Sequence, residues 1–137
     1  MVSKRTSIIV LVIVAILAVT AGIYTPKLLN MGNDYGDVTV QEAKKLIEDE
    51  PELVILDVRT DAEYNDGHIE GATNFPVEEL ANRLTELDKN SELLVYCRTG
   101  NRSSTAVSIL EDAGFSKIYH MSEGISAWTQ QGYPIVQ

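Results

Sequence analysis

The chain has 137 residues, 45% of them hydrophobic, which is enough for one globular domain of ordinary size. Residues 34–137 contain all 20 acidic residues and 8 of the 11 basic ones, and this net charge of −12 argues against nucleic acid as a partner. The single cysteine excludes an intrachain disulfide, and because only two histidines accompany it we expect no metal site and no cofactor.

The N-terminal segment contains a nearly continuous apolar run over residues 8–23. Lys4 and Arg5 lie before this run, so the positive-inside rule places the N-terminus in the cytoplasm and the rest of the chain across the membrane. As a helix, residues 6–24 would be about 28 Å long, close to the hydrocarbon thickness of about 30 Å.

These features predict a transmembrane anchor within residues 1–24, in contact with the membrane through residues 6–24. A tether over residues 25–37 and a soluble domain over residues 38–137 follow. The alternative is a cleaved signal peptide, for which residues 19–21 form an acceptable cleavage site. An anchored domain would lie on the extracytoplasmic side, periplasmic or extracellular, whereas cleavage would make it secreted.

Helical and strand-like patterns alternate along the predicted domain. Two capping boxes, Thr39 with Glu42 and Thr60 with Glu63, mark helix starts, and wholly apolar runs are typical of strands buried on both faces. In chain order the patterns predict a helix over 40–49, a strand over 53–58, a short helix after Thr60 that Gly67 stops, a brief strand within 71–76, a helix over 77–84, a strand over 92–96, a helix over 104–113, a strand over 118–121 and a last helix over 125–130. This alternation indicates an α/β fold with a parallel sheet between layers of helices.

Residues 93–104 place the single cysteine, Cys97, between a predicted strand and a predicted helix. A helix start collects unpaired backbone N–H groups and the positive end of the helix dipole, so it favours a thiolate. Asp57 also lies at the end of a predicted strand, and sites in parallel sheets form beyond the carboxyl ends of strands. We therefore expect Asp57 and Cys97 to line one cleft.

Separated motifs between residues 38 and 136 resemble those of a single-domain rhodanese, a sulfurtransferase module. They are Leu56-Asp57-Val58-Arg59, Glu63-Tyr64, Gly67-His68-Ile69, Gly71-Ala72-Thr73-Asn74-Phe75-Pro76, Tyr96-Cys97-Arg98-Thr99-Gly100-Asn101-Arg102-Ser103, Gly124-Ile125-Ser126-Ala127-Trp128 and Gly132-Tyr133-Pro134. Glu123 departs from the pattern, because the family often has a second glycine there, and it could strain the loop before the last helix. The resemblance implies a three-layer α/β/α fold with a central, mainly parallel sheet of about five strands.

The resemblance also implies that Cys97 carries sulfane sulfur as a persulfide. The donor would be a small sulfur-containing anion such as thiosulfate, or a persulfide. The acceptor would be cyanide, an external thiol or a protein, because the chain has no second cysteine to resolve the persulfide. Backbone N–H groups of the loop would hold the sulfur, and the Arg98 cation would suit an anionic donor. By this resemblance, the substrate-binding loop would consist of Arg98, Thr99, Gly100, Asn101, Arg102 and Ser103.

Asp57 and Arg59 are expected to support this loop. We predict that Asp57 pairs with Arg102, and that Arg59 forms a structural ion pair with Glu63. His120 carries no functional signal in the sequence.

Two alternatives remain open. Cysteine phosphatases and arsenate reductases on the same fold are similar, but five residues separate their cysteine from the following arginine, whereas four residues separate Cys97 from Arg102. The shorter loop favours one additional sulfur atom over a tetrahedral oxyanion. The alternative from another class is a membrane-tethered persulfide carrier or a non-catalytic rhodanese-like binding module.

Overall fold

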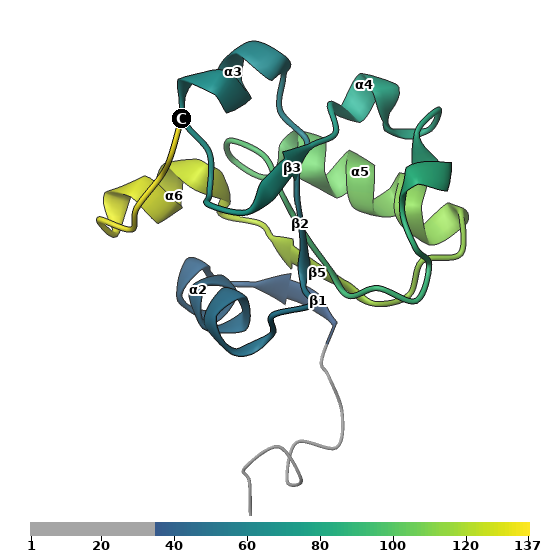
Figure 1. Cartoon of the computed structure of the whole chain (residues 1–137), viewed down its shortest axis with the longest axis horizontal. Helices are drawn as coiled ribbons and strands as arrows, with labels where there is room; N and C mark the ends of the chain where they lie inside the picture. The colour runs from purple at the N-terminus through teal and green to yellow at the C-terminus, as the bar shows by residue number, and fades with distance from the viewer. Residues whose placement is uncertain (1–34) are drawn as a thin grey trace, which may run out of the picture. The chain divides into compact units, whose positions relative to one another are not determined.

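A five-stranded parallel sheet forms the centre of residues 35–137, the part of the chain that the computed structural model describes (Figure 1). The strands are β1 (Gly36–Val38), β2 (Val54–Asp57), β3 (Ala72–Asn74), β4 (Leu93–Tyr96) and β5 (Ile118–Met121). Their order is β1-β5-β4-β2-β3, and each neighbouring pair is parallel. The predicted α/β class and parallel sheet are therefore confirmed.

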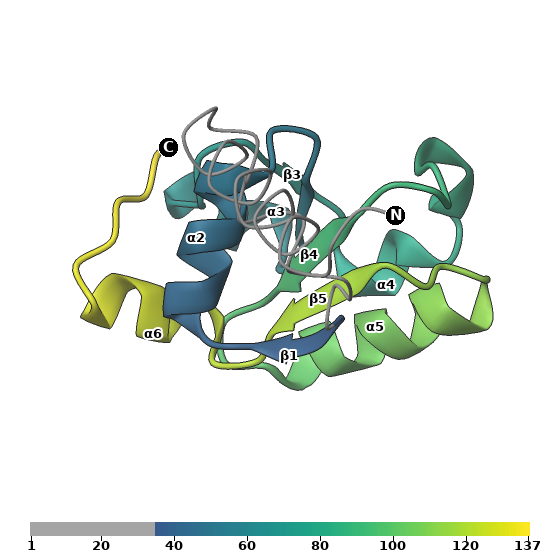
Figure 2. The same cartoon turned by 90° about the horizontal axis from the view of Figure 1, so that it is seen from below.

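Helices cover both faces of the sheet (Figures 1 and 2). One face carries α2 (Val40–Asp49) and α6 (Gly124–Gln130), and the other carries α4 (Val77–Leu80) and α5 (Asn101–Asp112). The remaining elements are α3 (Asp61–Asp66) and the 3-10 turn η2 (Leu84–Glu86). Strand side chains alternate between two cores, so that Leu94 and Tyr96 join the core under α2 and α6, whereas Val95 and Cys97 join the core under α5.

Both predicted capping boxes are present. The Thr39 hydroxyl accepts from the backbone N–H of Glu42, and the Glu42 carboxylate accepts from the backbone N–H of Thr39. Thr60 and Glu63 make the same reciprocal pair at the start of α3. Because each box satisfies two otherwise unpaired N–H groups, local sequence determines where α2 and α3 begin.

The helix predicted over residues 77–84 is shorter than expected. α4 ends at Leu80, and Leu84 begins the separate turn η2. Between them, Arg83 leaves the helical region with φ −116° and ψ 9°, and its guanidinium donates to the backbone oxygen of Asn74 and to Glu86. The segment predicted to be one helix is thus divided between two single-turn elements.

α5 begins at Asn101, three residues before the predicted start at residue 104. Gly100 precedes it with φ 103°, and the Gly100 carbonyl accepts the helical hydrogen bond from the N–H of Ser104. The earlier start places Arg102 and Ser103 in the first turn of the helix, directly beside the cysteine loop.

The strand β1 includes Gly36 and Asp37, which the sequence patterns assigned to the tether. Asp37 pairs with His120 of β5, and Val38 pairs with Met121. A three-residue strand that contains glycine and aspartate has neither an apolar run nor an alternation to reveal it. Its pairing with β5 at the edge of the sheet makes it a strand.

The predicted anchor over residues 1–24 lies outside the described residues. Within residues 35–137, no helix combines the length and the apolar character needed to cross a bilayer.

Candidate active site

Cys97 lies directly after β4, at the carboxyl end of the sheet, and only 1% of its surface is exposed. Asp57 ends the neighbouring strand β2 and pairs in register with Tyr96. The sheet therefore brings Asp57 and Cys97 to the same edge, with their side chains in separate hydrogen-bond networks. Both side chains are buried and neither lines the cavity at this edge, so they do not line one cleft as predicted.

The Cys97 sulfur lies within a curled loop that supplies hydrogen-bond donors. The backbone N–H of Gly100 donates to Sγ at 3.1 Å, and the Ser103 hydroxyl lies 3.3 Å from the same atom. Burial raises the pKa of the thiol, but hydrogen bonds from the Ser103 side chain and from the backbone N–H groups of Ser103, Gly100 and Thr99 outweigh it. The net pKa of Cys97 therefore lies below its ordinary value, which favours the thiolate.

Two glycines allow this loop to lie against the segment between β5 and α6. A Cβ atom on Gly100, where φ is +103°, would lie 2.2 Å from the Ser122 carbonyl oxygen. A Cβ atom on Gly124, where φ is +71°, would lie 2.2 Å from the Arg98 carbonyl oxygen. The backbone N–H of Ile125 donates to the Cys97 carbonyl at 2.9 Å. Both positions thus require glycine for backbone conformation and for close approach.

Glu123 is accommodated without backbone strain, contrary to the expectation from the sequence. Its φ of −76° and ψ of −17° are helical values that any residue adopts. Its carboxylate accepts from the backbone N–H of Val40 at 3.0 Å, so the side chain joins the loop before α6 to the first turn of α2.

Arg102 pairs with Glu63 of α3, and the predicted pairing with Asp57 is wrong. Its Nη1 and Nη2 atoms donate to the two carboxylate oxygens of Glu63 at 2.7 and 2.9 Å. The hydrogen bond from Arg102 lowers the pKa of Glu63 to about 2. The first turn of α5 is thereby joined to α3 at the rim of the cysteine loop.

The buried partner of Asp57 is Arg59, so the predicted pair between Arg59 and Glu63 is also wrong. The Arg59 guanidinium donates to both carboxylate oxygens of Asp57, with an Nη2–Oδ2 distance of 2.6 Å, and the Tyr96 hydroxyl donates to Oδ2 at 2.8 Å. Arg59 also donates to the Gly67 carbonyl at 2.7 Å. Asp57 is fully buried and Arg59 is 6% exposed, so these bonds satisfy a desolvated ion pair.

The other predicted loop residues differ in their surroundings. The Arg98 side chain is exposed, and the backbone N–H of Thr99 points toward the sulfur. Asn101 is exposed at the start of α5.

Within residues 35–137, no three side chains of histidine, cysteine, aspartate or glutamate are grouped so that they could hold a metal ion.

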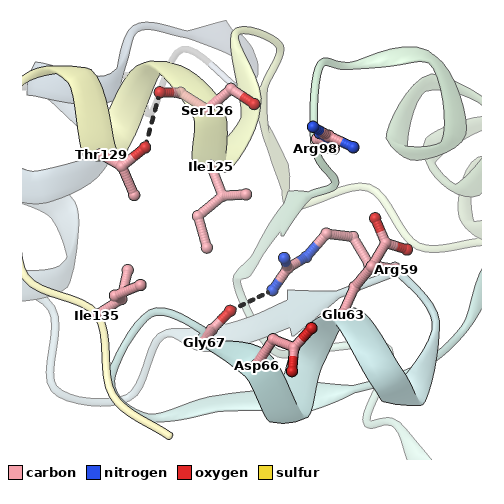
Figure 3. Close-up of a pocket in the computed structure, with 9 residues that line it drawn as sticks. All are labelled: Arg59, Glu63, Asp66, Gly67, Arg98, Ile125, Ser126, Thr129 and Ile135. Atoms are coloured by element: carbon pink, nitrogen blue, oxygen red, sulfur yellow. Dashed lines mark hydrogen bonds between the residues drawn. The ribbon is translucent and has the colours of Figure 1, made fainter.

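A cavity of about 250 Å³ opens beside the loop (Figure 3). Arg98 and Arg59 approach it from different sides, and Ile125 and Ile135 give it an apolar wall. The Cys97 side chain does not line this cavity, which reaches the loop at Arg98. The lining residues are Arg59, Glu63, Asp66, Gly67, Arg98, Ile125, Ser126, Thr129 and Ile135.

The structure adds His120 and Asp37 to the site, two residues that the sequence did not indicate. His120 of β5 places its Nε2 atom 2.8 Å from the Ser103 hydroxyl and its Nδ1 atom 2.8 Å from the Asp37 carboxylate. His120 is 17 residues from Ser103 and 83 from Asp37, so no local spacing links them. By contrast, the other histidine, His68, stacks on Tyr64 with ring centroids 3.8 Å apart.

Comparison with known proteins agrees with this geometry. The profile of the Rhodanese-like domain matches residues 39–131. The chain is 30% identical over 100 residues to a sulfurtransferase of Allochromatium vinosum, covering 73% of this chain and 94% of that protein. It is 38% identical over 74 residues to the thiosulfate sulfurtransferase GlpE of Shewanella oneidensis, covering 54% and 73%. Some other relatives are longer proteins, of which the match covers half or less.

Solved structures show the same fold. A rhodanese-related protein from Thermoplasma volcanium superposes with a TM-score of 0.68 at 31% identity, covering 74% of this chain and 98% of that one. The rhodanese-like domain of the Anabaena protein Alr3790 gives the same TM-score at 36% identity, covering 77% and 80%. With a profile match over most of the chain, a relative matched almost end to end and a cysteine loop at the carboxyl edge of a parallel sheet, this chain belongs to the rhodanese-like domain family.

Proposed function

We propose that the domain is a sulfurtransferase that carries sulfane sulfur as a persulfide on Cys97. The observation that carries this proposal is the set of donors around Sγ, with Gly100 N–H at 3.1 Å and the Ser103 hydroxyl at 3.3 Å. These donors stabilise negative charge on sulfur, whether it belongs to the thiolate or to the terminal atom of a persulfide. Relatives that are named sulfurtransferases support the same general activity.

The reaction has two balanced steps. With thiosulfate as donor, the Cys97 thiolate attacks the outer sulfur, a new S–S bond forms, and the old S–S bond breaks so that sulfite leaves with its electron pair. An acceptor then attacks the outer sulfur of the persulfide, and Cys97 leaves as the thiolate. With cyanide as acceptor the product is thiocyanate. The acceptor is external because the chain holds one cysteine.

The cavity is lined by the guanidiniums of Arg98 and Arg59 and also by the carboxylates of Glu63 and Asp66, so an anionic donor depends on Arg98 and not on the overall charge of the lining. Arg98 lies next to Cys97 in the loop and is exposed, so its guanidinium is placed to bind an oxyanion. Arg59 lines the same cavity from the neighbouring strand end, although Asp57 already neutralises it. We therefore assign donor binding first to Arg98.

Phosphoryl or arsenyl chemistry has less support. Such a reaction needs the loop arginine to bind a tetrahedral oxyanion, but both terminal nitrogens of Arg102 donate to Glu63. The loop is also one residue shorter than in those enzymes. A persulfide carrier or a non-catalytic binding module remains the second candidate, and the single thiol is the observation that suits a carrier.

Intact-mass measurement of the full chain tests the proposal. Treatment with thiosulfate or a persulfide donor should add the mass of one sulfur atom, and Cys97→Ser should abolish this gain. Cyanide should then remove the added sulfur with formation of thiocyanate at a steady turnover. Loading without turnover would identify a carrier, and no loading with either donor would overturn the proposal. Cys97-dependent hydrolysis of an aryl phosphate without loading would favour the phosphatase.

We also propose that residues 1–24 anchor the protein in the membrane, with the domain on the extracytoplasmic side. The apolar run over residues 8–23 and the preceding Lys4 and Arg5 support this topology. Fractionation of cells that express the full chain tests it. Recovery with the membrane fraction and sensitivity to protease added outside the membrane would support the anchor, whereas a shortened, freely soluble product would identify a cleaved signal peptide.

A further inference from the structure

A chain of hydrogen-bonded side chains connects the Cys97 sulfur to the surface of the domain. The Ser103 hydroxyl lies 3.3 Å from Sγ and 2.8 Å from Nε2 of His120, and Nδ1 of His120 lies 2.8 Å from Oδ1 of Asp37. Ser103 is fully buried and His120 is 8% exposed, whereas the Asp37 side chain is 73% exposed. The series therefore runs from a buried thiol to a solvated carboxylate.

The fold builds this series from elements that are far apart in sequence. β1 and β5 are in register, so Asp37 lies directly beside His120. β5 and β4 are in register at His120 and Val95, two residues before Cys97. The first turn of α5 then places Ser103 between the imidazole and the sulfur.

The donors and acceptors in this series determine where its protons lie. The Asp37 carboxylate only accepts hydrogen bonds, so Nδ1 of His120 must carry a proton. In the neutral imidazole, Nε2 then holds a lone pair and accepts from the Ser103 hydroxyl. That hydroxyl has one proton but three acceptors within reach, namely Nε2, the Gly100 carbonyl and the Cys97 sulfur. Which of them receives it depends on where the other protons lie.

We propose that Ser103, His120 and Asp37 form a proton relay that activates the Cys97 thiol. The Cys97 S–H bond breaks as the proton passes to the Ser103 oxygen, and the original hydroxyl proton passes to Nε2 of His120. A neutral thiol and a neutral imidazole thus become a thiolate and an imidazolium, with no proton gained or lost. Afterwards the Ser103 hydroxyl donates to the sulfur, and Asp37 stabilises the imidazolium.

His120 is a positioning residue, since it acts on sulfur through Ser103. Asp37 of β1 faces the imidazole from one side, and Ser103 of α5, with Cys97 behind it, faces it from the other. The imidazolium also places a positive charge near the thiolate, which would lower the pH at which the thiolate forms. This inference rests on the proposed function only in taking Cys97 as the reacting thiol.

The test is a thiolate titration of the full chain without any sulfur donor. Ultraviolet absorbance is measured against pH for each variant and for the same variant carrying Cys97→Ser, so that the difference reports the single thiolate. His120→Asn keeps a polar side chain but cannot take up the proton, and it should raise the titration midpoint by about one pH unit. Asp37→Asn should raise it by less, because the carboxylate is exposed and solvent screens its charge.

Two control variants remove the same chemical groups elsewhere. His68→Asn removes the other imidazole, and Asp112→Asn removes an exposed carboxylate of α5; both should leave the midpoint unchanged. Circular dichroism establishes whether each variant is folded. If His120→Asn does not fold, Asp37→Asn provides the test of the relay. Equal midpoints in the wild type and the folded relay variants would overturn the relay. Sulfur loading by mass is a separate readout, so a failed relay and a failed sulfur transfer are distinguishable.

Discussion

Arg102 and Glu63 form a bidentate ion pair that joins the first turn of α5 to α3, with N–O distances of 2.7 and 2.9 Å. The pair lies at the rim of the cysteine loop, and both side chains are about one-third exposed, at 33% and 29%. Because the pair uses both terminal nitrogens of Arg102, this arginine supports the loop, and the proposed contact with a donor is assigned to Arg98.

Glu63→Gln tests the strength of this pair. Pairing lowers the pKa of Glu63 from 4.5 to about 2, so its stabilisation is fully present above about pH 5 and is lost as the pH falls toward 2. After allowance for solvent screening, we expect the variant to lose about 1–2 kcal/mol of unfolding free energy at neutral pH. Urea denaturation at several pH values measures this, and a difference that does not shrink in acid would contradict the assignment.

Asp57→Asn should destabilise the domain more strongly. The substitution removes a fully buried charge and leaves the guanidinium of Arg59 without its counter-ion in a nearly closed site. Breaking a buried ion pair from one side typically costs about 3–5 kcal/mol. Urea denaturation at neutral pH checks this value against Asp112→Asn, an exposed aspartate that should change stability by no more than about 0.5 kcal/mol.

Gly124→Ala should disturb the cysteine loop through backbone contact. A methyl group there would lie 2.2 Å from the Arg98 carbonyl oxygen, so the loop that holds the sulfur must move. Gly132→Ala is the matched control, because Gly132 has a similar φ of +76° but no atom within 4 Å of the added carbon.

In both glycine variants the left-handed backbone conformation should lower the unfolding free energy by about 1–2 kcal/mol. Gly124→Ala should lower the unfolding free energy further, because of the close contact, and should also raise the pH midpoint of the Cys97 titration. Thermal unfolding and the thiolate titration give the two readouts. Equal behaviour of the two variants would show that the close approach has no effect on the loop.

Arg98→Ala should weaken anionic donors selectively. The exposed guanidinium lies beside the cavity, and losing one solvated charge contact corresponds to about 1 kcal/mol, or about fivefold in kcat/KM for thiosulfate. For a sulfur donor that carries no negative charge, kcat/KM should fall by less than about twofold. Lys89→Ala removes a positive charge from the opposite, amino-terminal side of β4 and serves as the control. Equal losses for both donors would contradict the role of Arg98.

Local sequence determined much of the fold of residues 35–137. The helix over 40–49 and the strand over 118–121 were predicted with the bounds that the structure has, and both capping boxes are formed. These features depend on hydrogen bonds and apolar periodicity within a few residues, so they can be read from a short window. The position of Cys97 between a buried strand and a helix start can likewise be predicted from a short window of sequence.

Tertiary structure alone decided the partners of the charged and polar side chains. Arg102 pairs with Glu63, 39 residues away, and His120 lies between Asp37 and Ser103. Such partners come together only when parallel strands and the helices between them set the spacing, and several candidates of suitable charge exist for each group. The sequence therefore determined where the Cys97 sulfur lies, whereas the packing of β1, β5, α3 and α5 decided which side chains surround it.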